Sequence, residues 1–182
     1  MPLKSFETSP TPFPTDHGPL LEYVPRRSDA AEEGLRIRAR RVFPASRNEL
    51  FAAWTTRTEL ESWLGFRAHS RAVVKPHAGG AFRLELAEGP IIHVITGTAM
   101  EIRVGEFASF TWIHHDTGDY ESTVDVAFRQ RRDQSELSLV HHSIESRREA
   151  AWLMRLWAAA LDRLDRYVVT SGLAARSASS AA

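Results

Sequence analysis

Residues 146–168, SRREAAWLMRLWAAALDRLDRYV, carry the strongest indication of the fold. The segment begins with a capping box, in which Ser146 can accept from the third helical amide while Glu149 reaches back to the cap. Apolar residues then recur at helical spacing, in a stripe that is wider than a simple surface helix needs. We therefore expect a long final helix that a sheet wraps over much of its circumference. The stripe consists of Ala150, Trp152, Met154, Leu156, Trp157, Ala160, Leu161, Leu164, Tyr167 and Val168.

Two further capping boxes lie in the first third of the chain and predict two short helices. Ser46-Arg47-Asn48-Glu49 opens the first, which we expect to run to about Trp54. Thr56-Arg57-Thr58-Glu59 opens the second, and Gly65 ends it. Before them, apolar residues alternate with arginines over residues 35–41. This period of two predicts a half-buried first strand.

Apolar residues also alternate in several runs between the short helices and the final helix, and turn signals such as Gly79-Gly80 separate these runs. Consecutive strands that are joined by tight turns form an antiparallel meander. The predicted fold class is α+β, a helix-grip fold with two short helices after the first strand. Its curved antiparallel sheet has about six strands and wraps around the C-terminal helix. Beyond the first strand, the runs are 82–86, 91–102, 107–114, 124–128 and 137–141.

The two ends of the chain differ in composition from the middle. Residues 1–33 hold six of the nine prolines, so we expect an extended or disordered arm there. Its apolar residues 20–24 could dock on the domain or on a second subunit. We place the folded domain at 34–170 and a disordered Ser/Ala-rich tail at 171–182.

Composition excludes several classes of function. Lys+Arg and Asp+Glu each number 23, so the basic excess that accompanies nucleic-acid binding is missing. The chain has no cysteine, which excludes disulfides, thiol nucleophiles and thiolate metal sites. The start resembles no secretory signal, and no apolar run approaches the roughly 20 residues that cross a bilayer. We expect a cytoplasmic protein without stable membrane association.

Six short motifs follow one another along the chain. They are Phe43-Pro44-Ala45-Ser46 with residues 49–54, Trp63-Leu64-Gly65, Gly79-Gly80-Ala81-Phe82-Arg83, residues 97–102, Phe110-Thr111-Trp112, and Ala151-Trp152 with Leu156 and Leu161. In this order they resemble the START-like (SRPBCC) superfamily, and within it the branch named for homology to the activator of the heat-shock-protein-90 ATPase. Leu64 and Ala151 depart from that branch, which has Trp and Gly there.

The resemblance covers about residues 37–168 and implies a cavity between the sheet and the final helix. Such a cavity would hold a lipid, a hormone, a polyketide intermediate or another apolar molecule. The resemblance implies no metal and no cofactor.

Large aromatic side chains are numerous for a domain of this size. Each of them could simply pack in the core, since aromatic residues dominate protein cores. Alternatively, several of them line an apolar pocket with a few polar groups, which is the usual form of a small-molecule site. The candidate ligand-binding residues are Trp54, Trp63, Phe66, Phe82, Phe110, Trp112, His114, His141, Met154 and Trp157.

Histidines form two adjacent pairs, His114-His115 and His141-His142. Neighbours on a strand point to opposite faces, so each pair can place only one ring inside. His114 and His141 share the apolar faces of their strands, and we expect them at the cavity mouth as candidate general bases. The plainer alternative is a solvated or structurally bonded histidine.

Other polar residues near these histidines are weaker candidates. His93 lies within a strand, and a carboxylate among Asp116, Asp119 and Glu121 could orient an imidazole, although a solvated hairpin tip explains all three. The histidines show no metal-ligand spacing such as His-Glu-x-x-His, so we expect no metal site.

Three functions remain open. The first is binding of a small apolar molecule without a reaction. The second is a cyclase, dehydratase or aromatase, with His114 or His141 as base and one of Trp54, Trp112 or Trp157 shaping the substrate. The third is a chaperone-regulating or homodimeric interaction module, suggested by the Pro-rich arm and by residues 91–95, which are apolar on both strand faces.

Overall fold

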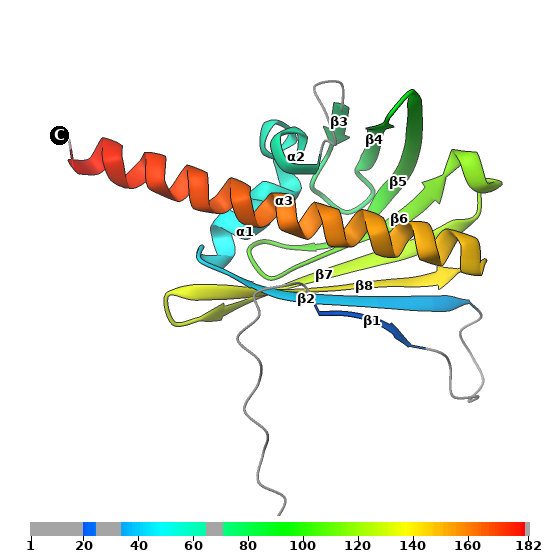
Figure 1. The fold of residues 1–182 in the computed structure, drawn as a ribbon, viewed down its shortest axis with the longest axis horizontal. Helices are drawn as coiled ribbons and strands as arrows, with labels where there is room; N and C mark the ends of the chain where they lie inside the picture. The colour runs from blue at the N-terminus through cyan, green and yellow to red at the C-terminus, as the bar shows by residue number, and fades with distance from the viewer. Residues whose placement is uncertain (1–19, 25–33, 65–70, 181–182) are drawn as a thin grey trace, which may run out of the picture.

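An eight-stranded antiparallel sheet, in the order β1-β2-β8-β7-β6-β5-β4-β3, forms the framework (Figure 1). The computed structural model describes residues 20–24, 34–64 and 71–180, and side chains over 34–64 and 71–171. Helix α3 crosses one face of the sheet, with α1 and α2 beside it (Figure 1). The elements are β1 (Leu20–Val24), β2 (Leu35–Phe43), α1 (Arg47–Thr55), α2 (Arg57–Leu64), β3 (Arg71–Val74), β4 (Ala81–Glu88), β5 (Ile91–Arg103), β6 (Phe107–His114), the 3-10 helix η1 (His115–Thr117), β7 (Glu121–Arg131), β8 (Gln134–Ile144) and α3 (Arg147–Ser180).

This architecture confirms the predicted α+β helix-grip fold, with two strands more than expected. One is β1, which comes from the Pro-rich arm and pairs with β2 from Leu20↔Arg40 to Val24↔Arg36. Proline is tolerated at the ends of an edge strand, so the flanking prolines hid this strand from sequence reasoning. The other is β3, whose four residues are too few to show an alternation.

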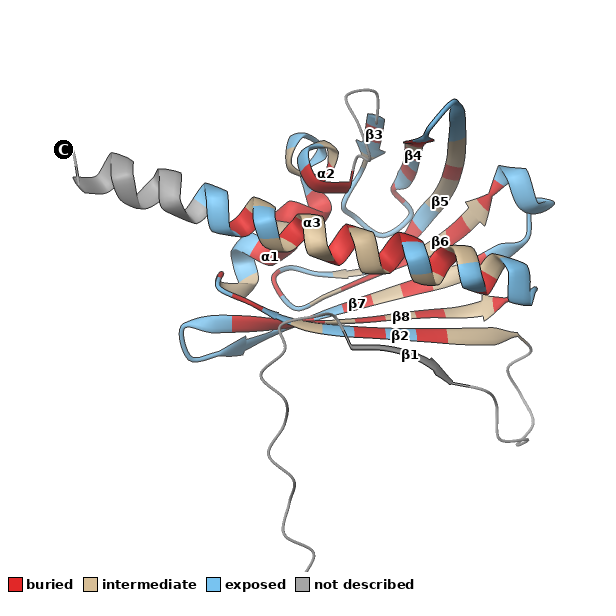
Figure 2. Ribbon diagram, viewed as in Figure 1, coloured by how far each residue is buried: buried red, intermediate tan, exposed pale blue. Residues whose placement is uncertain are grey.

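The core lies between α3 and the sheet, where buried residues concentrate (Figure 2). Of residues 150–168, only Ala151, Arg155 and Arg166 are exposed, which supports the expectation of a wrapped helix. At about 25 cal/mol per Å² of buried apolar surface, this face supplies much of the free energy of folding. Its fully buried apolar side chains include Leu153, Trp157, Leu161 and Leu164.

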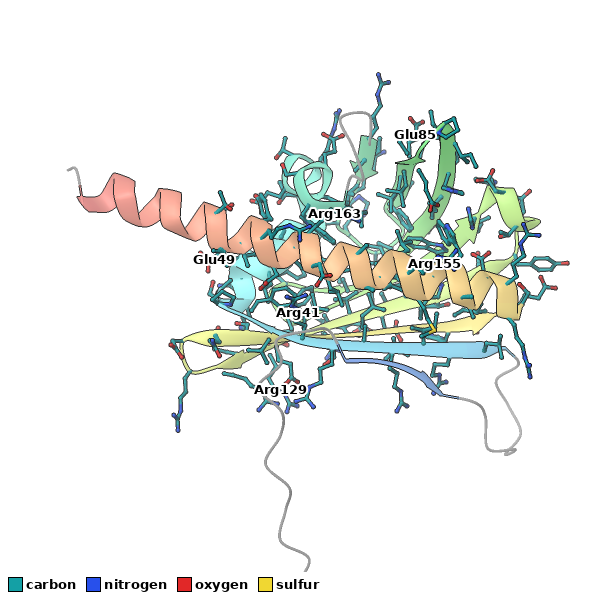
Figure 3. All side chains as sticks on the ribbon, in the orientation of Figure 1. Arg41, Glu49, Glu85, Arg129, Arg155 and Arg163 are labelled. Carbon is teal, nitrogen blue, oxygen red and sulfur yellow. The ribbon has the colours of Figure 1, made fainter. Side chains whose placement is uncertain are left out.

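Two arginines fasten helix α3 to its neighbours (Figure 3). Arg163 donates from Nε to the carbonyl oxygen of Trp63 at 2.9 Å, which joins α3 to the end of α2. Arg41 on β2 donates from Nη2 to Asp165 Oδ2 at 2.9 Å. These contacts keep α2 and β2 against the helix around which the candidate site is built.

The helix ends show where local signals were sufficient. The capping box at Ser46 is complete, with both reciprocal hydrogen bonds between Ser46 and Glu49. Ser146 accepts from the Glu149 amide at 3.1 Å, as expected, but the Glu149 carboxyl group turns to His114 instead. Helix α3 continues to Ser180, into the segment 171–182 for which we expected a disordered tail. Alanine, which recurs there, is the best helix former.

The structure also bears on two expectations about surfaces, one for the apolar residues 91–95 and one for membrane-spanning segments. Ile91 and Ile92, at the start of β5, are exposed, and the arm strand β1 lies at the far edge of the sheet from them. Among the described residues, no helix is long and apolar enough to cross a membrane.

Candidate functional site

An apolar pocket lies between helix α3, the two short helices and strands β3, β4 and β6. The cavity is small, with a volume of about 30 Å³. Every side chain that lines it is apolar, and none is charged. Such a lining, at a site where helices meet the sheet, is typical of small-molecule pockets. The lining residues are Trp54, Leu60, Leu64, Val74, Phe82, Leu84, Phe110, Trp112 and Trp157.

A glycine on β5 gives the pocket its shape. Gly97 pairs with Phe82 on β4, and a Cβ atom at Gly97 would lie 2.4 Å from Phe82 Cε1 and 2.0 Å from the Thr111 carbonyl oxygen. Only glycine therefore lets the Phe82 ring lie over β5, where it meets Phe110 edge-on with ring centroids 5.5 Å apart. The wall of the pocket depends on this close approach.

Two of the tryptophans on the pocket keep an unpaired indole N–H. Trp54 Nε1 and Trp112 Nε1 are buried and have no acceptor within the described part of the chain. Trp157 Nε1 donates to His141 Nδ1 at 3.1 Å, and Trp63 Nε1 donates to the Ala53 carbonyl oxygen at 2.8 Å. A buried donor without a partner costs about 1–3 kcal/mol, so the two unpaired N–H groups are unusual.

We expected His141 at the mouth of the cavity, but it is fully buried beneath the pocket. Trp157 donates to Nδ1, so the neutral ring carries its proton on Nε2, which donates to Ser122 Oγ at 2.8 Å. Burial, and secondarily the charge of His142, lowers the pKa of His141 to about 3. With both ring nitrogens bonded to protein, His141 has none free to take a proton from a substrate.

His114, at the end of β6, lines a second and more polar cavity of about 20 Å³. Trp112 lines both cavities and so forms part of the wall between them. His114 Nδ1 donates to Glu149 Oε1 at 3.0 Å, and the ring stacks on Trp152 with centroids 4.3 Å apart. The other polar side chains of this cavity are Thr117, Tyr120, Ser122, Ser143, Glu145, Ser146 and Glu149.

The remaining predicted site residues lie elsewhere. Trp63 packs behind Trp54 at 5.1 Å between centroids, and Met154 is half-buried against the core, so neither lines the apolar pocket. Phe66 lies outside the described residues. Asp119 pairs with His115, away from the candidate bases. His93 and Asp116, by contrast, both contact His114. Asp116 was one of the three carboxylates expected to be able to orient an imidazole, whereas no sequence spacing indicated the contact with His93.

A helix that is gripped by a curved sheet over an apolar pocket defines a START-like helix-grip protein. Within that class, residues 44–169 match the family described as activator of Hsp90 ATPase homolog 1-like protein, and the chain belongs to this family. The resemblance of the six motifs is thereby confirmed.

Solved structures show the same fold. CalU16 from Micromonospora echinospora is 20% identical, with 84% of this chain and 88% of that chain covered and a TM-score of 0.60. Protein CV1439 from Chromobacterium violaceum is 22% identical, covering 73% and 96% with a TM-score of 0.64. An HSP90 activator from Plasmodium falciparum is 24% identical, covering 60% and 73% with a TM-score of 0.51. At these identities the likeness extends to the fold alone. Among proteins with curated descriptions, none matches the chain.

Proposed function

We propose that the protein binds a small apolar molecule between the sheet and helix α3, and that this molecule offers a hydrogen-bond acceptor to Trp54 and Trp112. The observation that carries the proposal is the pair of buried indole N–H groups without an acceptor on an otherwise apolar pocket. A carbonyl or ether oxygen on the ligand would pair them. The START-like fold supports the same class of ligand.

The dimensions of the pocket restrict the ligand. A cavity of about 30 Å³ is far smaller than the usual range of about 300–1,000 Å³, so a ligand must move the lining side chains apart to enter. Trp112 and Trp157 lie 5.3 Å apart between ring centroids, so a flat ring could lie against either indole face. A single aromatic ring that carries a ketone, ester or ether requires less of this movement than a long acyl chain.

A cyclase or dehydratase is the second candidate function, and it rests on His114. Of the two candidate bases, His114 is the one that lines the polar cavity, and Glu149 orients its ring. In such an enzyme, His114→Gln would abolish turnover of a bound ketide while leaving its affinity within about twofold. Affinity without turnover in the unaltered protein favours the binding function.

The proposed binding is tested with two planar molecules of nearly the same shape, acetophenone and α-methylstyrene, of which only the ketone accepts a hydrogen bond. Calorimetry should show acetophenone binding more tightly by about 2- to 10-fold, the equivalent of about 0.5–1.5 kcal/mol. The double variant Trp54→Phe, Trp112→Phe should lose this preference, and the control Trp63→Phe should keep it. Equal affinities in the unaltered protein, or no binding of either molecule, would refute the proposal.

A further inference from the structure

A cluster of polar side chains lies where strands β5 and β6 meet the 3-10 helix η1. His93 Nδ1 is 3.2 Å from His114 Nε2 and 2.9 Å from Asp116 Oδ2, and His114 Nε2 is 3.4 Å from the same oxygen. The three atoms therefore form a compact triangle. We propose that His93, His114 and Asp116 bind a divalent first-row transition-metal ion such as Zn²⁺.

The outer nitrogen of each imidazole already has a carboxylate partner. His114 Nδ1 lies 3.0 Å from Glu149 Oε1, and His93 Nε2 lies 3.2 Å from Glu88 Oε2. Metal-ligating histidines almost always donate their second N–H in this way, which fixes the tautomer and the orientation of the ring. Glu88 is itself held by Trp152 Nε1, which donates to Glu88 Oε2 at 3.3 Å.

These partners determine what faces the centre of the triangle. In the tautomers whose N–H groups are directed at the outer carboxylates, His93 Nδ1 and His114 Nε2 present lone pairs to one another and to Asp116. In these tautomers the three acceptors repel one another unless a proton or a metal ion lies between them. With those tautomers the cluster has the electronic character of a ligand set, because its lone pairs point inward and its protons point outward.

The spacing agrees with a metal centre. Imidazole nitrogen and carboxylate oxygen bind Zn²⁺ at about 2.0–2.2 Å, so two ligand atoms on one ion lie about 2.8–3.6 Å apart at ligand–metal–ligand angles of about 90–110°. The observed separations of 2.9, 3.2 and 3.4 Å match this closely. Two histidines and one carboxylate suit Zn²⁺, Fe²⁺ or Co²⁺, and they leave coordination positions open for water or a substrate.

A β-bulge brings the two histidines to one face. Arg103 pairs with Phe107 at the turn, and uninterrupted pairing would place Thr96 opposite His114. The register shifts between Ala99 and Glu101, so Ile95 lies opposite His114 instead. Because a shift of one residue reverses the face of every side chain beyond it, His93 comes to the side of His114.

The surroundings suit a bound ion. The side chains of His93 and His114 are 12% and 4% exposed, whereas Asp116 is 46% exposed and leaves a path from solvent. Trp152 covers both rings, at 5.0 Å from His93 and 4.3 Å from His114 between centroids. The imidazoles are thus held rigidly, and the third ligand can close on an arriving ion.

The experiment titrates Zn²⁺ into the untagged full chain, after removal of metal with a chelator, and follows binding by calorimetry at pH 7. Co²⁺ in a parallel titration reports the ligand field through its visible absorption. We expect one equivalent to bind. His93→Gln and Asp116→Asn should each weaken binding by at least about 100-fold, because a lost ligand should cost at least as much as a lost outer-shell partner.

His115→Gln is the matched control, since His115 is the chain neighbour of His114 but bonds to Thr96 and Asp119. It should bind Zn²⁺ as the unaltered chain does. Circular dichroism verifies that each variant folds, and Zn²⁺ should raise the melting temperature of the unaltered chain and of His115→Gln alone. Absence of saturable binding at one equivalent would overturn the proposal, as would unchanged affinity in His93→Gln and Asp116→Asn.

Discussion

The indole Nε1 of Trp157 donates a hydrogen bond to Nδ1 of His141 at 3.1 Å, within the buried core. This bond aims the Trp157 ring along the pocket wall and determines which nitrogen of His141 is protonated. In this respect Trp157 differs from Trp54 and Trp112, whose indole N–H groups have no such acceptor within the described residues. The pocket is therefore built from tryptophans of two kinds, one held by the protein and one available to a ligand.

The buried state of His141 should make stability depend on pH. Its folded pKa of about 3 lies below the ordinary value of 6.5, so between these values the unfolded chain binds the extra proton. The contribution of His141 to the free energy of unfolding is then fully present above pH 6.5. It is lost as the pH falls toward 3, by up to about 1.4 kcal/mol per pH unit. The free energy of unfolding, measured with urea between pH 7.5 and 4, should change less steeply with pH in His141→Gln than in the unaltered protein. The control His115→Gln should show the same pH dependence as the unaltered protein. Parallel slopes for all three proteins would contradict this account.

Gly97 should be essential to the shape of the pocket. Gly97→Ala forces a methyl group against the Thr111 carbonyl and the Phe82 ring, and overpacking of this kind costs about 1–3 kcal/mol or more. Because Phe82 lines the pocket, we also expect at least a fivefold loss of acetophenone affinity. Gly89→Ala is the control, since a Cβ there meets nothing within 4 Å but must adopt a positive φ. It should lower the melting temperature without changing affinity, and equal affinity losses in both variants would be inconsistent with a wall formed by Phe82.

Glu88 should tune the metal site without being a ligand. Glu88→Gln removes the carboxylate that accepts from His93, and loss of an outer-shell partner lowers metal affinity by about 10- to 100-fold. Glu85→Gln is the matched control, because Glu85 lies on the same strand and pairs with Arg83. Zn²⁺ titrations of the two variants measure the difference. If Glu88→Gln bound Zn²⁺ as tightly as Glu85→Gln, the role of Glu88 would be disproved.

The helix-grip fold could be predicted from the sequence because its signals are local. A capping box such as Ser46 with Glu49 spans four residues, and alternation within one strand needs no knowledge of its neighbours. Strand β1 could not be predicted, because it gains its pairing only from β2. The sequence therefore predicted too few strands, although it predicted correctly the order in which the helices and the main strands follow one another along the chain.

The candidate site could be predicted only in part. Sequence reasoning found the aromatic residues, but it could not tell which indoles are paired, since the acceptors of Trp63 and Trp157 lie on other segments. It could not bring His93 to His114 either, because that meeting depends on a bulge that no turn signal indicates. Both features depend on tertiary contacts.

The most direct test of the central claim is the indole N–H spectrum of the uniformly ¹⁵N-labelled protein during an acetophenone titration. The five tryptophans give five such signals, which single Trp→Phe variants assign. If the pocket binds an acceptor, the indole N–H signals of Trp54 and Trp112 should move downfield. The signals of Trp63 and Trp157 should change little, because these N–H groups keep their hydrogen bonds to Ala53 and His141. Indole signals that all remain fixed up to the solubility limit, or that move equally with acetophenone and α-methylstyrene, would contradict the account.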